Sequence, residues 1–209
     1  MRVSLVIVAP MLLSAALAVP LLASSITLDA GHADYAARIA GGKLVSQIKD
    51  QTRGSGSTRW NAPGNVVARL GSRAEVRLPR DGSLGFVGRP GQVVWLLPQA
   101  QRAGVLWLGW NTQEISGRQV RGAVTWSLRS VRGPGRVVLY QTSSFGSPDI
   151  LFSSARSRPG SRRVPLGTHA HGNWAFTRAG RYRLTFRMSA RTPGGRTLRD
   201  TATLAFQVG

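Results

Sequence analysis

Two of the chain's three histidines, His169 and His171, lie two residues apart in the segment PLGTHAHGNWAF, residues 165–176. In an extended strand, residues i and i+2 project from the same face, so the two imidazoles would lie side by side. Paired imidazoles suit a divalent transition metal, but two ligands are rarely a complete set. The segment therefore predicts part of a metal site whose other ligands come from elsewhere in the chain.

The third histidine, His32, lies close to Asp29 and Asp34, two of only eight acidic residues. A carboxylate beside a histidine can bind a metal itself, or it can accept the imidazole proton and fix the tautomer. We predict a metal site at His32, His169 and His171, with Asp29 or Asp34 as fourth ligand or as support. Such a set is typical of zinc and is open to copper, manganese or iron. The alternative is surface or loop-supporting histidines, because His-x-His alone is a weak motif.

Asn173 and Trp174 follow the histidine pair and are candidates for the wall of the same pocket. A tryptophan beside His171 would keep a metal pocket dry; alternatively, it pins a loop onto a sheet. Packing is the more common role for tryptophans in strongly apolar segments, which here are Trp95, Trp107 and Trp110.

The sequence gives little support for catalysis. It has no G-x-S-x-G motif, and its serines cluster in turn-rich segments such as TSSFGSPD and FSSARSRPGS. Eight acidic residues leave few carboxylate pairs for glycoside hydrolysis. A zinc hydrolase at the three histidines would need Asp29 or Asp34 as general base. We expect instead a protein that is not an enzyme.

Short strands must position these residues. RYRLTFRM and TATLAFQV alternate apolar and polar residues, and the turn RTPGGRTLRD joins them into a hairpin. The segment of residues 32–50 fits a helix poorly across Gly41 and Gly42 and is predicted as two strands. Further predicted strands are AVTWSLRSV, GRVVLYQT, QVVWLLP, GVLWLGW, EVRLP and LGFVG. About ten strands with turns every 8–12 residues or so predict an all-β protein, an antiparallel β-sandwich.

The C-terminal half, from about Gly122, is predicted to be immunoglobulin-like. In FTRAGRYRLTF, Tyr182 holds the position of a tyrosine corner, in which a buried tyrosine hydroxyl bonds to the backbone just upstream. No linker separates the N-terminal half. We therefore predict one β-sandwich domain over residues 26–209.

Residues 1–25 have the pattern of a secretory signal peptide: one positive charge, a long apolar run and small residues at its end. The alternative is an uncleaved N-terminal anchor, because the run approaches the length of a membrane span. We expect a secreted or cell-envelope protein with no stable membrane span after cleavage. The chain has no cysteine, so packing and sheet hydrogen bonds must stabilise the exported domain without disulfides.

The net charge of +20 comes from 28 basic residues, of which only Lys43 and Lys49 are lysine. One interpretation is a surface that binds a polyanion such as nucleic acid, teichoic acid or anionic lipid. The other is the codon bias of a GC-rich genome, which the scarcity of lysine favours. No helix with a basic stripe is predicted, so we expect no specific nucleic-acid binding.

Three segments, LDAGHADY (28–35), VVWLLPQAQRAGVLWLGWNTQEI (93–115) and GTHAHGNWAFTRAGRYRLTF (167–186), together resemble the actinobacterial surface-anchored repeat domain, also called the choice-of-anchor M domain family. The likeness extends over nearly all of residues 26–209 and includes all three histidines. It implies an exported envelope protein associated with an ABC transporter of the manganese or zinc type. Family members are often anchored to the envelope. This chain ends at TLAFQVG without a sorting motif, so we do not expect that anchor.

The sequence therefore supports two alternative functions. The first is a noncatalytic envelope protein that binds zinc, copper or manganese in association with an ABC-type uptake system, with the transporter's substrate-binding protein as partner. The second is an adhesive or structural cell-surface module that binds an envelope polymer or a partner protein, with purely structural histidines.

Overall fold

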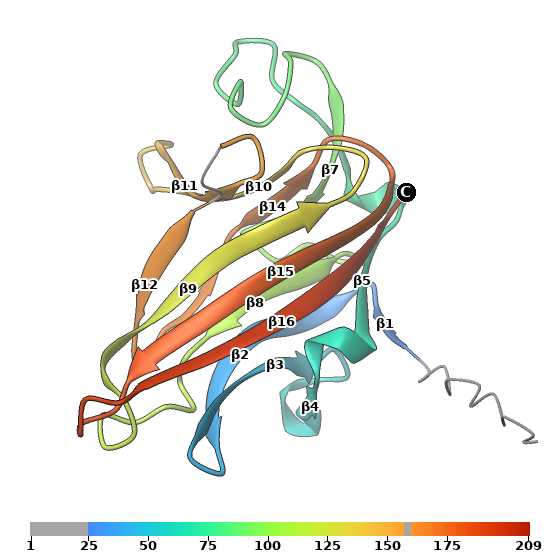
Figure 1. Cartoon of the computed structure of the whole chain (residues 1–209). Coiled ribbons are helices and arrows are strands. Elements are labelled where there is room, and N and C mark those ends of the chain that lie inside the picture. Colours follow the sequence, from blue (N-terminus) through green and yellow to red (C-terminus); the bar gives the residue numbers. More distant parts are fainter. Residues whose placement is uncertain (1–24, 157–159) are drawn as a thin grey trace, which may run out of the picture.

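The computed structural model describes residues 25–156 and 160–209 of the chain (Figure 1). Within these residues the fold has sixteen strands and three short 3-10 helices, which are η1 (Ser55–Ser57), η2 (Pro63–Asn65) and η3 (Ser72–Ala74). None of the helices in this part of the chain is long or apolar enough to span a membrane. The predicted all-β sandwich is confirmed. The predicted signal peptide lies outside the described residues, apart from Ser25.

One layer is a six-stranded sheet in the order β1-β5-β16-β15-β9-β12. Its strands are β1 (Ile26–Leu28), β5 (Val66–Leu70), β9 (Arg121–Arg132), β12 (Ser161–Pro165), β15 (Gly180–Arg191) and β16 (Thr197–Val208). The predicted hairpin is confirmed as β15 and β16, which pair along their whole length. The inward residues of β15 are buried as their alternation predicts, namely Tyr182, Leu184, Phe186 and Met188.

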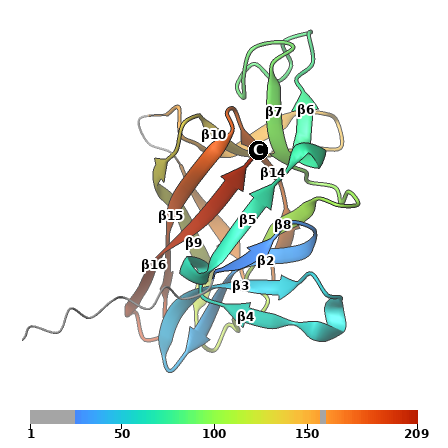
Figure 2. The same cartoon turned by 90° about the vertical axis from the view of Figure 1, so that its right-hand side faces the viewer.

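The other layer consists of two five-stranded sheets (Figures 1 and 2). The histidine sheet has the order β13-β8-β2-β3-β4, with strands β2 (Gly31–Ala40), β3 (Lys43–Gln51), β4 (Arg59–Asn61), β8 (Leu106–Asn111) and β13 (His169–His171). The loop-capped sheet has the order β11-β10-β14-β7-β6, with strands β6 (Glu75–Arg77), β7 (Val93–Leu97), β10 (Val137–Thr142), β11 (Pro148–Ser153) and β14 (Asn173–Phe176).

Gly172 alone separates β13 from β14, so the chain passes directly from the histidine sheet into the loop-capped sheet. A Cβ atom at Gly172 would lie 3.0 Å from the carbonyl oxygen of Tyr140 and 3.1 Å from the ring of Trp110. The close approach of these neighbours explains why glycine occupies the crossing point.

Most strand pairs are antiparallel, as predicted, but β1–β5, β5–β16 and β2–β8 are parallel. A parallel pair needs a long connection, because the chain must return to the same end of the sheet. Between β2 and β8 that connection contains β3 to β7. It leaves the far edge of β8 free to pair with β13, which comes much later in the chain.

The core between the two layers is aromatic. Tyr35 of β2 stacks on Trp126 of β9 with ring centroids 5.6 Å apart and lies 5.1 Å from the ring of Phe186. Trp174 of β14 is fully buried, 6.1 Å from Trp126. One hydrophobic cluster therefore joins both layers and includes residues from Leu28 to Val208.

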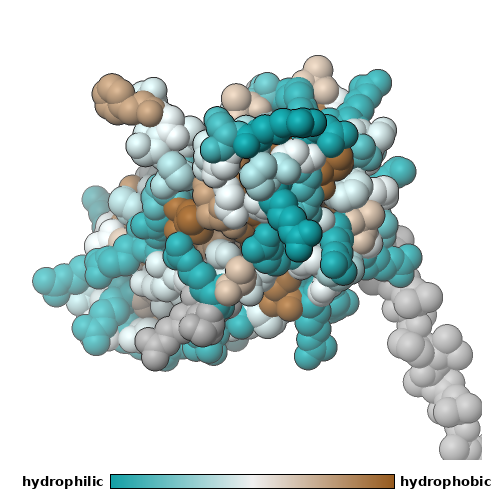
Figure 3. All heavy atoms as spheres, turned by 90° about the horizontal axis from the view of Figure 1, so that it is seen from above, coloured by the Kyte–Doolittle hydropathy of each residue, from teal (hydrophilic) through white to brown (hydrophobic). Residues whose placement is uncertain are grey.

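The predicted strand LGFVG, residues 84–88, is wrong: these residues form turns in a loop between β6 and β7. Leu84 and Phe86 pack on the outer face of the loop-capped sheet, where Phe86 meets the ring of Tyr140 edge-on at 5.0 Å. A short apolar run between turn residues is common to buried strands and to loops whose apolar side chains cap a sheet, so this pattern does not separate the two. Seen from above, this end of the molecule is mostly hydrophilic, with apolar side chains in separate patches (Figure 3).

The predicted tyrosine corner is present. The hydroxyl of Tyr182 donates a hydrogen bond of 2.7 Å to the carbonyl oxygen of Arg178, while the side chain is 1% exposed. The bond fixes the bend of the chain that leads into β15.

We expect Tyr182→Phe to lower the free energy of unfolding by about 1–2 kcal/mol, because the Arg178 carbonyl loses its partner while the ring still packs. Urea denaturation should show a lower midpoint with an unchanged slope. Tyr140→Phe is the control, since within the described part of the chain the Tyr140 hydroxyl has no hydrogen-bond partner and its ring is also buried. Equal midpoints for the two variants would show that the corner bond does not stabilise the fold.

Candidate metal centre

Three neighbouring strands of the histidine sheet position the site. β2 carries His32 and Asp34 and runs parallel to β8, with Asp34 opposite Gly109. β13 carries His169 and His171 and pairs with the other edge of β8, where His171 also lies opposite Gly109. Because alternate residues of a strand share a face, all four side chains project from the face that points away from the core.

Gly109 permits the four side chains to converge. A Cβ atom at this position would collide with Asp34 Oδ1, and it would lie only 2.6 Å from the carbonyl oxygen of Ala170 and 2.7 Å from His171 Cε1. With no side chain at Gly109, the carboxylate and the imidazole approach each other across the backbone of β8. A larger residue would have to push them apart.

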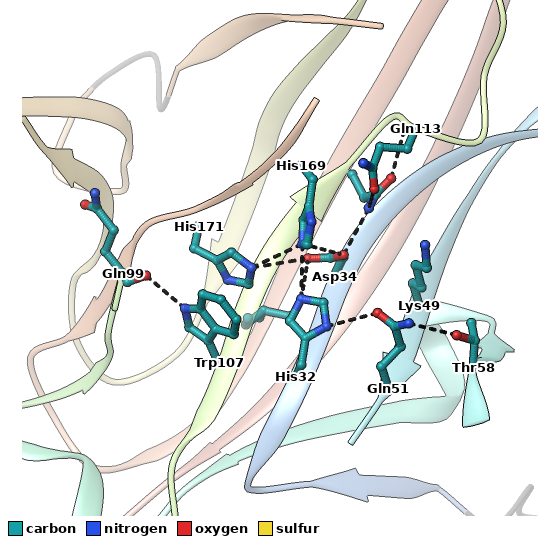
Figure 4. Close-up of polar contacts among 12 residues, drawn as sticks. His32, Asp34, Lys49, Gln51, Thr58, Gln99, Trp107, Gln113, His169 and His171 are labelled. Carbon is teal, nitrogen blue, oxygen red and sulfur yellow. Dashed lines mark hydrogen bonds and ion pairs between the residues drawn. The ribbon is translucent and has the colours of Figure 1, made fainter. Parts of the chain in front are cut away.

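The three Nε2 atoms and the carboxylate of Asp34 point toward one another (Figure 4). His169 Nε2 lies 3.1 Å from His32 Nε2 and 3.3 Å from His171 Nε2. It lies 3.2 Å from Asp34 Oδ2. Asp34 Oδ1 is 3.4 Å from His32 Nε2 and 3.8 Å from His171 Nε2. The prediction that folding brings His32 to the late histidine pair is confirmed.

The separations between the ring nitrogens are close to the edges of a tetrahedral coordination shell. For metal–ligand bonds of about 2.0–2.1 Å, two ligand atoms of a tetrahedron lie about 3.3 Å apart. The two contacts between ring nitrogens are 3.1 and 3.3 Å. Each imidazole also has one carboxylate oxygen at 3.2–3.8 Å, which is Oδ2 for His169 and Oδ1 for His32 and His171. The cluster can therefore hold one metal ion with three imidazole nitrogens and one carboxylate oxygen.

Gln51 on β3 determines the tautomer of His32. Its amide nitrogen donates to the carbonyl oxygen of Ser55 at 3.3 Å and to Thr58 Oγ1 at 2.9 Å. Its amide oxygen therefore faces His32 Nδ1, at 3.0 Å. An amide oxygen only accepts, so Nδ1 carries the proton and Nε2 directs a lone pair into the cluster. A metal-binding histidine usually has such an outer partner.

Asp34 is a fully buried carboxylate. Burial alone would raise the pKa of Asp34, but the contacts with His32 and His169 and the Asn111 amide together hold the pKa below its usual value. Asn111 Nδ2 donates to Asp34 Oδ2 at 3.1 Å. Asp34 is therefore ionised at neutral pH and supplies a negative charge in a place with little water.

Trp107 of β8 forms the aromatic wall of the site. Its ring stacks on the imidazole of His171, with centroids 3.7 Å apart and planes 12° apart. The indole nitrogen donates to the carbonyl oxygen of Gln99 at 2.8 Å, which fixes the ring. Burial lowers the pKa of His171 to about 4, against the opposing effect of the Asp34 charge. His171 is consequently uncharged at pH 7 and has no imidazolium proton to lose before it binds a metal.

The structure places the other predicted site residues outside the cluster. Asp29 is exposed after the end of β1 and is not one of the four converging residues, so the aspartate of the site is Asp34. Trp174 packs in the core, where its indole nitrogen donates to the carbonyl oxygen of Leu108 at 2.9 Å. Asn173 Oδ1 accepts from the backbone N–H of Gln99 at 3.0 Å. Both residues follow the bend at Gly172 and belong to the loop-capped sheet.

Four residues that shape the site were missed from the sequence, namely Gln51, Trp107, Gly109 and Asn111. Three of them alternate along β8, in a segment predicted to be apolar on both faces. The available signal was the interruption of one face by a glycine and an amide, which pure packing does not require.

The chain matches no protein-family model, and searches of curated proteins and of solved structures gave no significant match. Any function of the chain must therefore be inferred from the geometry of this cluster.

In the metal-free protein we expect the His171 ring to titrate with a midpoint near pH 4, because burial disfavours its charged form. The unfolded chain takes up this proton near pH 6.5 and the folded chain only near pH 4, so stability should fall as the pH drops through that window. NMR of the imidazole Cε1–H signals measures the midpoint, and His171→Gln identifies the signal. A midpoint at or above 6.5 would contradict a buried, neutral ring.

Proposed function

We propose that the protein binds one transition-metal ion, zinc before others, at His32, Asp34, His169 and His171. The observation that carries the proposal is the mutual approach of three imidazole Nε2 atoms beside one buried carboxylate. Each contact between two ring nitrogens needs one proton to be favourable, and a neutral imidazole has a single N–H, which in His32 points to Gln51. One central cation satisfies all of these lone pairs together.

The ligand set favours zinc. Imidazole nitrogens suit zinc, copper, iron and nickel, whereas manganese prefers carboxylates, carbonyls and water. Copper(II) binds nitrogen ligands more tightly than zinc does, but it prefers a square-planar or tetragonal arrangement. The spacing of 3.1 and 3.3 Å between ring nitrogens is close to tetrahedral, which supports zinc as the preferred ion, copper as the strongest competitor and manganese as the weakest of the three.

The number of protein ligands supports binding rather than catalysis. Catalytic zinc sites have three protein ligands and leave one position for water, while closed sites have four. Asp34 supplies the fourth ligand here, held by the Asn111 amide. We therefore propose a noncatalytic metal-binding protein.

We further propose that the ion is presented outside the cell to an ABC-type metal uptake system through the substrate-binding protein of that system. Two observations from the sequence support this role. One is the signal-peptide pattern, and the other is the family resemblance of residues 28–35, 93–115 and 167–186. The side chain of His169 is 35% exposed and lies on β13, a three-residue strand at the edge of its sheet. A partner can reach this ligand while Asp34 stays buried.

Calorimetric titration of the metal-free protein should show one zinc ion bound per chain. The triple variant His32→Ala, His169→Ala, His171→Ala should show no stoichiometric binding, because three of the four ligands are lost. Asp34→Asn should weaken binding by about 100-fold or more, since the charged ligand is removed. Asp29→Asn is the matched control and should bind zinc as the unchanged protein does. Full binding by the triple variant would refute the site.

A separate test concerns the close approach across β8. Gly109→Ala should weaken zinc binding by about 10- to 100-fold, because the new methyl group displaces Asp34 and His171. Gly64→Ala is the control, since nothing lies within 4 Å of a Cβ at Gly64. Competition with a chromophoric chelator measures the affinities, and circular dichroism checks the fold. Equal affinities would mean that the site does not depend on the missing side chain.

A further inference from the structure

The six-stranded sheet turns its outer face toward the viewer in Figure 1, and strand register places many arginines on that face. Strand register places nine arginines at its outward positions, and we call this surface the arginine face: Arg69, Arg121, Arg132, Arg163, Arg181, Arg183, Arg187, Arg191 and Arg199. Arg187 is half-buried and the others are exposed. The outward positions between them carry mainly threonine, serine, alanine and glutamine.

No carboxylate occupies an outward position on these six strands. Their one acidic residue, Asp200, lies opposite the inward Met188. Its carboxylate accepts a hydrogen bond of 2.7 Å from the backbone N–H of Ser46 on β3, across the sandwich. Within the described residues, arginine ion pairs form at Arg59 and Arg162 and at none of the nine. The positive charge of the arginine face is therefore not neutralised by the chain itself.

Two hollows mark the ends of the arginine face. The smaller, of about 260 Å³, is lined by Arg121, Arg163 and Arg191. The larger, of about 630 Å³, is lined by Arg69, Arg181 and Arg183. Arg181 and Arg191 are ten residues apart on β15, which corresponds to about 34 Å along the strand. Each hollow is lined by three arginines, and further arginines lie on the strands between the two.

We propose that the arginine face binds a linear polymer of phosphate groups. A phosphate offers several acceptor oxygens and can take hydrogen bonds from more than one guanidinium group, whereas one guanidinium fork already matches a carboxylate. Clusters of three arginines therefore fit phosphate better than carboxylate. The hydroxyl pairs Thr185–Thr203 and Ser127–Ser161 add further donors along the row.

The composition of the face disfavours two other anionic partners. Single-stranded nucleic acid is usually bound with aromatic side chains on which the bases stack, and no outward strand position here is aromatic. Proteins that enter a bilayer surface present bulky apolar residues between their basic ones. The apolar residues at outward positions are small or short, such as Val67 and Ala205.

The arginine face and the metal centre lie on opposite layers of the sandwich, so both can be occupied together. Figure 4 shows the strands of the six-stranded sheet behind the histidine cluster. Binding of the polymer is thus independent of the proposed metal binding.

Binding of long-chain inorganic polyphosphate to the full chain tests this proposal, with affinity measured by fluorescence anisotropy at several salt concentrations. The variant Arg183→Gln, Arg187→Gln, Arg191→Gln should lose about 10-fold or more in affinity and show a smaller salt dependence. The control Arg53→Gln, Arg80→Gln, Arg118→Gln removes the same charge from exposed loop positions and should change affinity by less than about 2-fold. If the first variant does not fold, Arg163→Gln, Arg199→Gln replaces it.

Equal losses in the two variants would overturn the proposal, because only net charge would then matter. Tighter binding of polyglutamate, of oligothymidine or of vesicles containing anionic lipid than of polyphosphate would also overturn it. Asp34→Asn should bind polyphosphate normally, and the face variant should bind zinc normally. These two measurements separate a failure of this proposal from a failure of the metal site.

Discussion

A buried, ionised carboxylate is the constraint on which the site depends. Moving a charged carboxylate out of water costs several kcal/mol unless opposite charge and hydrogen-bond donors replace the water. At Asp34 the replacements are the Asn111 amide and the three imidazoles, whose Nε2 atoms all approach the carboxylate. Gln51 directs the proton of His32 outward, which leaves a lone pair facing the cluster rather than a donor. Lone pairs that face one another repel, and a central cation would turn this repulsion into attraction by binding all of them.

The strand order of the histidine sheet brings the ligands of the site together. β8 pairs with β2 on one side and with β13 on the other, so residues 137 positions apart, His32 and His169, come within 3.1 Å. The aromatic core fixes the back of this sheet against the six-stranded sheet, and the cluster forms on the front. The same layering leaves the outer face of the six-stranded sheet free to carry unpaired arginines. One sandwich thus presents two chemically different surfaces on opposite sides.

Local patterns predicted much of this arrangement. The period-two alternation of β15 and β16 identified their buried faces, and the His-x-His spacing placed two imidazoles on one face of β13. Local patterns did not predict the long-range strand register, because they do not show which strands pair with the two edges of β8. From the sequence, Asp29 and Asp34 were left as alternatives, although the same spacing rule places Asp34, two residues after His32, on the histidine face. The fold places Asp34 opposite Gly109. Trp107 rather than Trp174 became the wall for the same reason, since Gly172 bends the chain away between His171 and Trp174.

At the proposed metal centre, three imidazoles and one carboxylate would surround a single ion. X-ray absorption at the zinc edge, on protein loaded with one equivalent of zinc, tests this arrangement most directly. We expect four nitrogen or oxygen ligands at about 2.0–2.1 Å, with the outer-shell scattering of three imidazole rings. A shell of five or six oxygen ligands without imidazole scattering would contradict it.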